Sequence, residues 1–169
     1  MTRLPMSKEK GFSLVELLIV IAIILIIAAI AIPNIIRAKI SANESAAVAT
    51  MRTIYSAEAA YDAQGWNNPT AIGFSAVLQD LGSTSCNPAT MTSACLLDNQ
   101  VANAGAAPKS GYLFTYAPVA LAGKNVDFTL NVDPVVRGST GQRSFFTDST
   151  GVIRYNRNSP GTITDAPLQ

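Results

Sequence analysis

The chain has 169 residues, which is enough for one folded domain with a hydrophobic core of its own. Its formal net charge is only +1, so it lacks the basic excess of a general nucleic-acid-binding protein, and no nucleic-acid partner is expected. It contains no histidine, which removes the commonest general base and the commonest metal ligand.

The N-terminal end combines a short basic segment with a long apolar one. Residues 1–11 carry three basic side chains against one acidic side chain, and an apolar stretch then runs from Phe12 to Ile32. A helix of this length, with a rise of about 1.5 Å per residue, spans about 30 Å, the thickness of a bilayer's hydrocarbon core. We therefore predict a transmembrane helix here rather than the core helix of a soluble protein.

A secretory signal peptide is the main alternative, because it also has a basic start and an apolar run, and Ala29–Ala31 resembles its cleavage site. The apolar run is longer than the usual hydrophobic region of a signal peptide. It also contains Glu16, and a carboxylate in a membrane costs up to about 2.5–3.5 kcal/mol and is usually functional. A transmembrane segment with a functional carboxylate is therefore favoured.

The residues around this carboxylate carry a resemblance to a known family. The segment Lys10–Leu18, KGFSLVELL, is similar to the processing signature of type IV prepilins and type II secretion pseudopilins. The signature has a glycine at the end of a basic leader, a phenylalanine, a glutamate four residues later and an unbroken apolar helix. Pro33 also stands where many family members have a proline, and a proline inside a helix predicts a kink.

The resemblance implies how this segment is processed and assembled. A membrane peptidase of the family cuts after the leader glycine, here Gly11, and methylates the new N-terminal amine, here that of Phe12. The family's glutamate, here Glu16, pairs with the N-terminal amine of a neighbouring subunit, because the two charges neutralise each other in an apolar helical bundle. The leader then lies in the cytoplasm and the C-terminal part in the periplasm.

Residues 34–62 are predicted to continue as a helix, because they are rich in alanine and contain no glycine or proline. Apolar side chains recur there at steps of three, four and seven residues, which indicates one buried helix face. These are Ile40, Ala47, Met51, Ile54 and Tyr61, with Val48 and Tyr55 beside them. Gly65 supplies a stop signal.

Residues 63–110 are predicted as a loop region with one short helix around Phe74–Leu81, because Pro, Gly, Asn and Ser interrupt the sequence repeatedly. The region contains the chain's two cysteines, Cys86 and Cys95. Outside the cytoplasm a disulfide between them is expected, and for so short a loop it adds about 2–3 kcal/mol of stability. The alternative is two unrelated free thiols.

Residues 111–157 show the alternation of apolar and polar side chains that predicts β-strands. Three or four antiparallel strands with one apolar face would cover the second half of the helix. The expected strands begin at Tyr112 and cover Val126–Val132, Arg143–Thr147 and Val152–Asn156, with a hairpin loop at 148–151.

Three other groups of side chains admit a functional interpretation, but a structural one is favoured for each. Carboxylates of the sheet region could bind calcium, although no ligand spacing is diagnostic and solvated loop carboxylates are favoured; they are Asp127, Asp133 and Asp148.

Arginines of the last strands could contact DNA or acidic residues of neighbouring subunits, although a solvated face is favoured; they are Arg137, Arg143, Arg154 and Arg157. Aromatic residues at helical spacing usually pack rather than conduct electrons; they are Phe12, Tyr55 and Tyr61. No catalytic residue, cofactor or metal site is predicted.

The expected fold is α+β, with a long N-terminal helix, half in the membrane and half packed on a small antiparallel sheet of three or four strands. The expected parts are a leader at 1–11, a membrane or filament-core helix at 12–33, and an extracytoplasmic domain at 34–169 with a polar tail at 158–169.

The expected function is that of a structural subunit of a type IV pilus or similar filament. A major-type pseudopilin of a type II secretion system is the alternative within the family. A secreted binding domain and a membrane-anchored protein that never polymerises are the alternatives outside it. The expected partners are other copies of the chain, the leader peptidase, the assembly machinery and the inner membrane. The filament would lie at the cell surface or span the periplasm.

Overall fold

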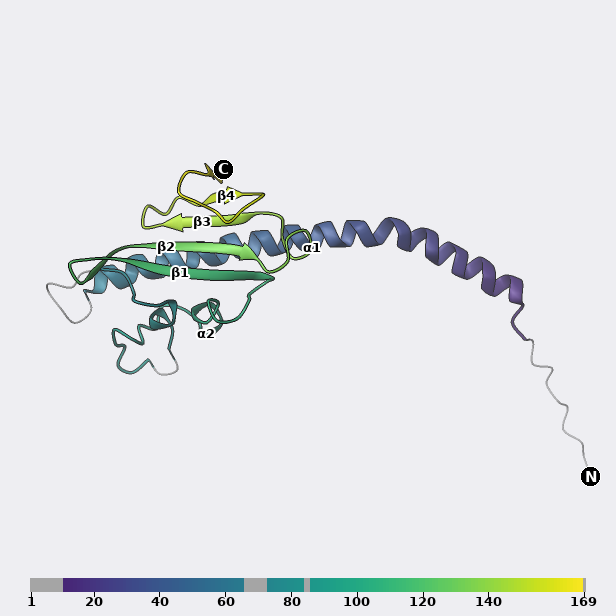
Figure 1. Ribbon diagram of the computed structural model, residues 1–169. Coiled ribbons are helices and arrows are strands. Elements are labelled where there is room, and N and C mark those ends of the chain that lie inside the picture. The colour runs from purple at the N-terminus through teal and green to yellow at the C-terminus, as the bar shows by residue number, and fades with distance from the viewer. Residues whose placement is uncertain (1–10, 66–72, 84–85, 169) are drawn as a thin grey trace, which may run out of the picture. The chain divides into compact units, whose positions relative to one another are not determined.

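The computed structural model describes residues 11–65, 73–83 and 86–168 (Figure 1). The predicted leader therefore lies outside the described residues, apart from Gly11. The chain divides into two compact units, residues 1–37 and 38–169, and each is described by itself below.

Helix α1 covers Leu14–Gln64 and confirms the long N-terminal helix. It includes Pro33, whose ring nitrogen has no hydrogen to donate to the preceding turn. The side-chain amide of Asn34 donates to the carbonyl of Ile30 at 3.1 Å, which gives the backbone next to the proline an additional hydrogen bond. The predicted kink at Pro33 stays a prediction. The helix ends before Gly65, whose φ of +57° lies in the left-handed region that terminates helices.

In the second unit, α1 contributes one face to the hydrophobic core. The apolar stripe predicted from the sequence is buried: Ile40, Ala47, Met51, Ile54 and Tyr61. From Ala47 onward these side chains join the same core cluster as Phe114, Phe128 and Phe145 of the sheet. The part of α1 in this unit lies along the sheet in Figure 1. Two glutamates, Glu44 and Glu58, are buried on this face as well, which the apolar stripe did not predict.

The sheet has five antiparallel strands in the order β1-β2-β3-β4-β5. They are β1 (Tyr112–Leu121), β2 (Lys124–Pro134), β3 (Ser144–Asp148), β4 (Arg154–Asn156) and β5 (Ala166–Pro167). This order makes each strand a neighbour of the next along the chain, and Figure 1 shows β1 to β4 side by side. The antiparallel sheet of the α+β prediction is confirmed.

The strand number and the polar tail need correction. Ala166 pairs with Tyr155 and Pro167 pairs with Arg154, so a fifth strand lies within the segment predicted as a polar tail. The Leu168 amide donates to the carbonyl of Ile153 at 2.7 Å, and its side chain packs against the core. A two-residue strand is too short to show an alternating pattern, which is why the sequence did not indicate it.

The β1–β2 hairpin explains one further difference. Ala122 and Gly123, between the strands, both have positive φ, of 51° and 80°, as a tight two-residue hairpin turn requires. Val119 pairs with Asp127 and Ala120 with Asn125, so Val126 is the extra residue of a β-bulge. Val126 was expected on the apolar face of its strand but is 47 % exposed, because the bulge interrupts the alternation.

The segment between α1 and the sheet is more than a surface loop. The short helix predicted around Phe74–Leu81 is a 3-10 helix, η1, over Leu78–Leu81, and a second short helix, α2, covers Asn99–Ala102. The Asp98 side chain accepts a hydrogen bond from the Val101 amide at 2.9 Å and caps α2. Apolar side chains of this segment lie in the core, so it covers part of the domain interior; they are Leu78, Leu81, Leu97, Val101, Ala102 and Ala104.

Candidate processing and assembly site

The predicted cleavage position lies outside the helix. Residues 11–13 precede α1, which begins at Leu14. Phe12 is 76 % exposed, and apart from the adjoining residues no atom lies within 4 Å of the position that a Cβ on Gly11 would occupy. The Gly11–Phe12 bond is therefore free of helical hydrogen bonding, and this segment is sterically open. A peptidase can bind such a segment without unwinding the helix first.

Glu16 lies at the N-terminus of α1 and interacts with it. Its Oε2 atom accepts a hydrogen bond from the backbone amide of Ser13 at 2.9 Å, and the Leu17 amide donates to the Ser13 carbonyl at 3.2 Å. This is one half of a capping box, in which a glutamate three residues after the cap satisfies an amide that the helix leaves free. The carboxylate thus binds the backbone amide of the residue that follows Phe12, whose amine is predicted to become the new N-terminus.

The helix that follows Glu16 exposes large apolar side chains along its length. They include Leu17, Leu18, Ile19, Ile24, Ile27 and Ile30, each at least half exposed. By length and composition α1 is able to cross a membrane, and none of its apolar window is buried within the structure. An apolar surface of this size needs lipid or other helices around it.

The second unit contains a partly buried ion pair between α1 and the residue before β3. Oε2 of Glu44 lies 2.8 Å from both Nε and Nη2 of Arg143. Oε1 accepts hydrogen bonds from the backbone amides of Gln142 and Arg143 at 2.9 and 3.1 Å. The Arg143 guanidinium also lies 5.6 Å from the ring centroid of Phe145 and 5.5 Å from that of Tyr155. Glu44 therefore fixes α1 to the sheet through four donors.

This arrangement corrects the expectation of a solvated face for Arg143, whereas Arg137 and Arg157 are exposed as expected. Arg143 is committed to Glu44, and Arg137 donates to the carbonyls of Gln142 and Arg157 at 2.6 and 2.7 Å. Both arginines therefore connect segments of the domain. Arg154 also donates to the carbonyl of Asp165 at 3.0 Å. The sequence did not indicate that these arginines bind acceptors within the domain.

Two of the three carboxylates considered for calcium, Asp127 and Asp148, have local hydrogen-bonding roles, whereas Oδ1 of Asp133 is buried without a hydrogen-bond partner. Asp127 accepts from the amides of Phe128 and Ser149, and Asp148 accepts from the amide of Thr150 in the β3–β4 turn. Within residues 11–65, 73–83 and 86–168, no group of three or more His, Cys, Asp or Glu side chains is placed to hold a metal ion.

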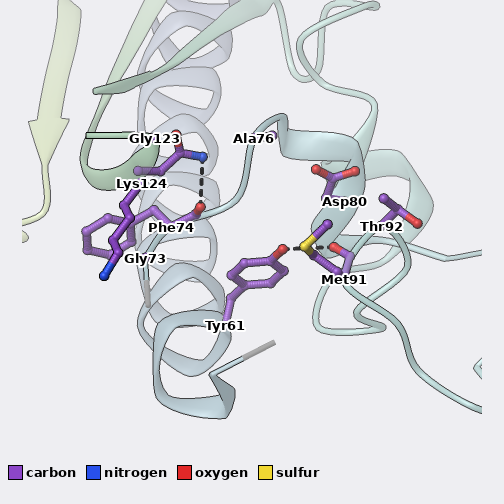
Figure 2. A pocket seen from close by; sticks show the side chains of 10 residues that line it. Tyr61, Gly73, Phe74, Ala76, Asp80, Met91, Thr92, Gly123 and Lys124 are labelled. Carbon is purple, nitrogen blue, oxygen red and sulfur yellow. Dashed lines mark hydrogen bonds between the residues drawn. The ribbon is translucent and has the colours of Figure 1, made fainter. Parts of the chain in front are cut away.

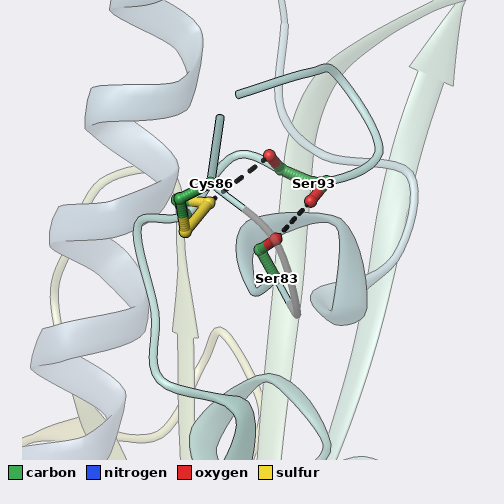
Figure 3. The surroundings of a disulfide bond; sticks show 4 residues. Ser83, Cys86 and Ser93 are labelled. Atoms are coloured by element: carbon green, nitrogen blue, oxygen red, sulfur yellow. Dashed lines mark hydrogen bonds between the residues drawn. A yellow bond between two sulfur atoms is a disulfide. The ribbon is translucent and has the colours of Figure 1, made fainter. Parts of the chain in front are cut away.

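Cys86 and Cys95 form a disulfide, with their Cα atoms 5.7 Å apart (Figure 3). Ser93 donates to Ser83 beside it, at 2.5 Å. The chain after Ser93 pairs with η1: the Ala94 amide donates to the Asp80 carbonyl and the Leu96 amide to the Leu81 carbonyl, both at 2.8 Å. The disulfide thus closes a loop whose ends are already hydrogen-bonded.

Removal of this disulfide is expected to lower the free energy of unfolding by about 2–3 kcal/mol, because the unfolded chain then gains loop entropy. The measurement is denaturant unfolding of the Cys86→Ala/Cys95→Ala protein, with the reduced wild type as control. The reduced protein and the double variant should lose similar amounts. Recovery of both cysteines as alkylated thiols from undisturbed protein would reject the pairing.

Comparisons with known proteins agree with the N-terminal signature. The model of the prokaryotic N-terminal methylation motif matches residues 6–32. The type IV major pilin protein PilA of Myxococcus xanthus is 43 % identical over 54 residues, which are 32 % of this chain and 24 % of the relative. The type IV wide pilus major component PilA4 of Thermus thermophilus is 54 % identical over 44 residues, which are 26 % of this chain and 34 % of the relative.

The similarity covers about a quarter to a third of the length of these relatives. No solved structure matches the chain. The α+β fold, with a long N-terminal helix and an antiparallel sheet, is pilin-like. The N-terminal part of the chain thus carries the methylation motif and is similar to the corresponding part of these type IV major pilins, which supports a place in the type IV pilin family.

Proposed function

We propose that this protein is a structural subunit of a type IV pilus. The observation that carries the proposal is the Gly11–Phe12 junction, exposed outside α1 and followed by Glu16 at the start of an apolar helix. A leader peptidase removes residues 1–11 and methylates the amine of Phe12. The mature subunit then waits in the inner membrane, with its C-terminal domain in the periplasm, until the assembly machinery adds it to a filament.

The exposed apolar surface of α1 gives this function a physical basis. A helix that leaves lipid for a bundle of identical helices exchanges one apolar environment for another, so the transfer has no large desolvation cost. The role requires no catalytic residue, as expected of a structural pilin. Both relatives are named as components of pili, which favours a pilus over a secretion pseudopilus.

Mass spectrometry of the mature protein, together with analysis of the sheared cell-surface fraction, tests this proposal. The expected mature chain begins at Phe12, carries one added methyl group on its amine and is present in the sheared filaments. A mature N-terminus after Ala31 would instead identify an ordinary signal peptide. Absence of the protein from sheared or secretion-associated filaments would identify an anchored protein that does not polymerise.

Cleavage is expected to depend on the small side chain at the predicted junction. Gly11→Val should slow cleavage about 100-fold, because a displacement of about 1 Å at a reacting bond can have an effect of this size. The precursor should then accumulate uncut in the membrane, as measured by its mass. Ser13→Ala, two residues further along, is the matched control and should be cut normally. Efficient cleavage of Gly11→Val at the same bond would contradict the assigned junction.

A further inference from the structure

Glu58 is the most completely buried carboxylic acid among the described residues of the domain. Its relative exposure is 0 %, and it lies on the face of α1 that packs against the core. Oε2 accepts a hydrogen bond from the Ser75 amide at 3.0 Å, and Oε1 lies 2.5 Å from Ser75 Oγ. Across the described parts of the chain, no basic side chain forms an ion pair with this carboxyl group.

Ser75 connects Glu58 to the first strand. Its Oγ atom lies 3.2 Å from the hydroxyl of Tyr116, and that hydroxyl donates to the Ser75 carbonyl at 2.9 Å. The three residues come from three elements: α1, the segment before η1, and β1. The network therefore joins the helix to the sheet through a segment that has no regular structure of its own.

Proton counting in this network favours a neutral carboxyl group. A protonated Glu58 donates from Oε1 to Ser75 Oγ, which frees the Ser75 hydroxyl to donate to Tyr116. The Tyr116 hydroxyl then donates to the Ser75 carbonyl, so every close contact has one donor and one acceptor. If Glu58 is ionised, the single Ser75 proton must go to the carboxylate, and the contact between Ser75 and Tyr116 loses its proton. The neutral form alone satisfies all four contacts.

We propose that Glu58 is held as a neutral carboxylic acid in the folded protein and forms, with Ser75 and Tyr116, a proton-dependent clasp. The clasp fastens α1 to β1 and holds residues 73–77 against both elements. Loss of the proton leaves a charge with no counter-ion in the core and removes a donor from the network, so the clasp weakens as the surroundings become alkaline.

Burial and the nearby Asp80 also favour the neutral form of Glu58. Burial raises the pKa of Glu58, the hydrogen bonds from Ser75 and Tyr116 oppose part of that effect, and the nearby Asp80 of η1 raises it further. Burial, with smaller contributions from Asp80 and Glu58, raises the pKa of Tyr61 to about 12, so this phenol stays neutral. Desolvation likewise raises the pKa of Tyr116 and of Asp80.

The adjacent cavity supplies no compensating cation. It has a volume of about 260 Å³ and is lined by residues including Tyr61, Phe74, Asp80, Lys124 and Asn125. Figure 2 shows Lys124 extending away from Tyr61 and Asp80. Asn125 donates to the carbonyls of Phe74 and Ser75, both at 3.1 Å, and so binds the backbone of Ser75 and of the residue before it.

The sign of the pH effect follows from the raised pKa. The folded state keeps a proton that the unfolded state releases near the ordinary value of 4.5, so the contribution of Glu58 to stability is greatest below that pH. It decreases as the pH rises from there through the pKa of folded Glu58, and the loss is complete above it. Each unit by which folding raises the pKa changes the unfolding equilibrium constant about tenfold.

Glu58→Gln tests the clasp, because the glutamine amide can donate to Ser75 Oγ and its carbonyl can accept from the Ser75 amide. The full-length protein in detergent micelles is unfolded thermally across the pH series. The decrease in wild-type stability with pH should be reduced in Glu58→Gln, and the variant should be the more stable protein at alkaline pH. Asp62→Asn, one turn further along α1, is the matched control and should keep the wild-type profile. Identical profiles for wild type and Glu58→Gln would overturn the proposal.

Infrared difference spectroscopy observes the proton directly. At a pH just above the ordinary glutamate value of 4.5, the wild type should show a protonated-carboxyl band that Glu58→Gln lacks. If Glu58→Gln fails to fold, Tyr116→Phe keeps the carboxyl group and the aromatic ring, and the same band should shift in frequency. Absence of the band in the wild type, or an unshifted band in Tyr116→Phe, would overturn the proposal. Neither outcome bears on pilus assembly, so this inference fails or stands separately from the proposed function.

Discussion

Cells that carry Glu16→Ala as their only copy of this subunit are expected to produce about tenfold less sheared filament, or less still. A loss of about 1.4 kcal/mol from each subunit addition is enough to weaken assembly by this factor. Cleavage after Gly11 should remain largely intact, so the variant should accumulate as processed protein in the membrane. Quantification of the sheared fraction and of the mature membrane form gives the two measurements.

The expected effect comes from the position of Glu16 in an otherwise apolar segment. An unpaired carboxylate there is costly, and a pairing with the amine of Phe12 in a neighbouring chain would remove that cost. Exposed side chains such as Leu17, Ile24 and Ile27 pack with little preference for one axial position. A charged pair would therefore set the axial register, as a buried polar residue does in coiled coils.

Glu16→Gln separates this role from helix capping. Glutamine can still accept the hydrogen bond that Glu16 takes from the Ser13 amide, but it carries no charge. If pairing with the amine drives assembly, the glutamine variant should fail as the alanine variant does. Normal filaments from Glu16→Gln would assign the residue to capping alone, and normal filaments from Glu16→Ala would remove it from assembly altogether. Loss of cleavage in Glu16→Ala would move its role to processing.

The sequence predicts the parts of this protein that depend on strong periodicity. The apolar stretch after Phe12 is a continuous run of apolar side chains, and the stripe from Ile40 to Tyr61 repeats an apolar side chain every three or four residues. Both patterns occur within α1. The alternation at Tyr112–Tyr116 and Phe128–Val132 predicts β1 and β2 for the same reason. The motif around Gly11, Phe12 and Glu16 is local in sequence, so its recognition required no knowledge of the fold.

Features that depend on tertiary contacts could not be predicted from the sequence in the same way. Strand β5 is formed by a hydrogen-bonding partner rather than by its own two residues, and Leu97 and Val101 are buried because η1 and the sheet enclose them. The bulge at Val126 shifts the pairing by one residue, which no alternating pattern can indicate. Each of these features is decided by a pairing or packing partner and not by the pattern of the segment itself.

The burial of Glu44 and Glu58 is indicated by their spacing along α1. Six of the nine buried positions of α1, namely 44, 47, 51, 54, 58 and 61, follow alternating steps of three and four residues. Glu44 and Glu58 therefore lie on the apolar face by spacing alone, and a stripe traced only through apolar residues omits them. An acidic residue at such a position indicates a hydrogen-bonded site in the core, because an unpaired carboxylate is not tolerated there.

Glu44→Ala is expected to lower the free energy of unfolding by about 3 kcal/mol, at the lower end of the effect of breaking a buried ion pair, because Arg143 is 30 % exposed. The substitution leaves the Gln142 and Arg143 amides without their acceptor, together with an unpaired guanidinium. Domains of this size are stable by about 5–15 kcal/mol, so such a loss would be a large fraction of the total. Denaturant unfolding of the full-length protein in detergent measures it.

The contacts between Glu44 and Arg143 also predict which related variants should lose more stability. Arg143→Ala removes the guanidinium and its ring contacts, but Glu44 keeps two backbone donors, so this variant should lose less stability than Glu44→Ala. The double variant should lose less than the sum of the two, because the pair is shared. Ser45→Ala, on the exposed face next to Glu44, is the matched control and should stay within about 0.5 kcal/mol of the wild type. If Arg143→Ala costs as much as Glu44→Ala, the backbone amides contribute nothing and the attachment of α1 to β3 depends on the guanidinium alone.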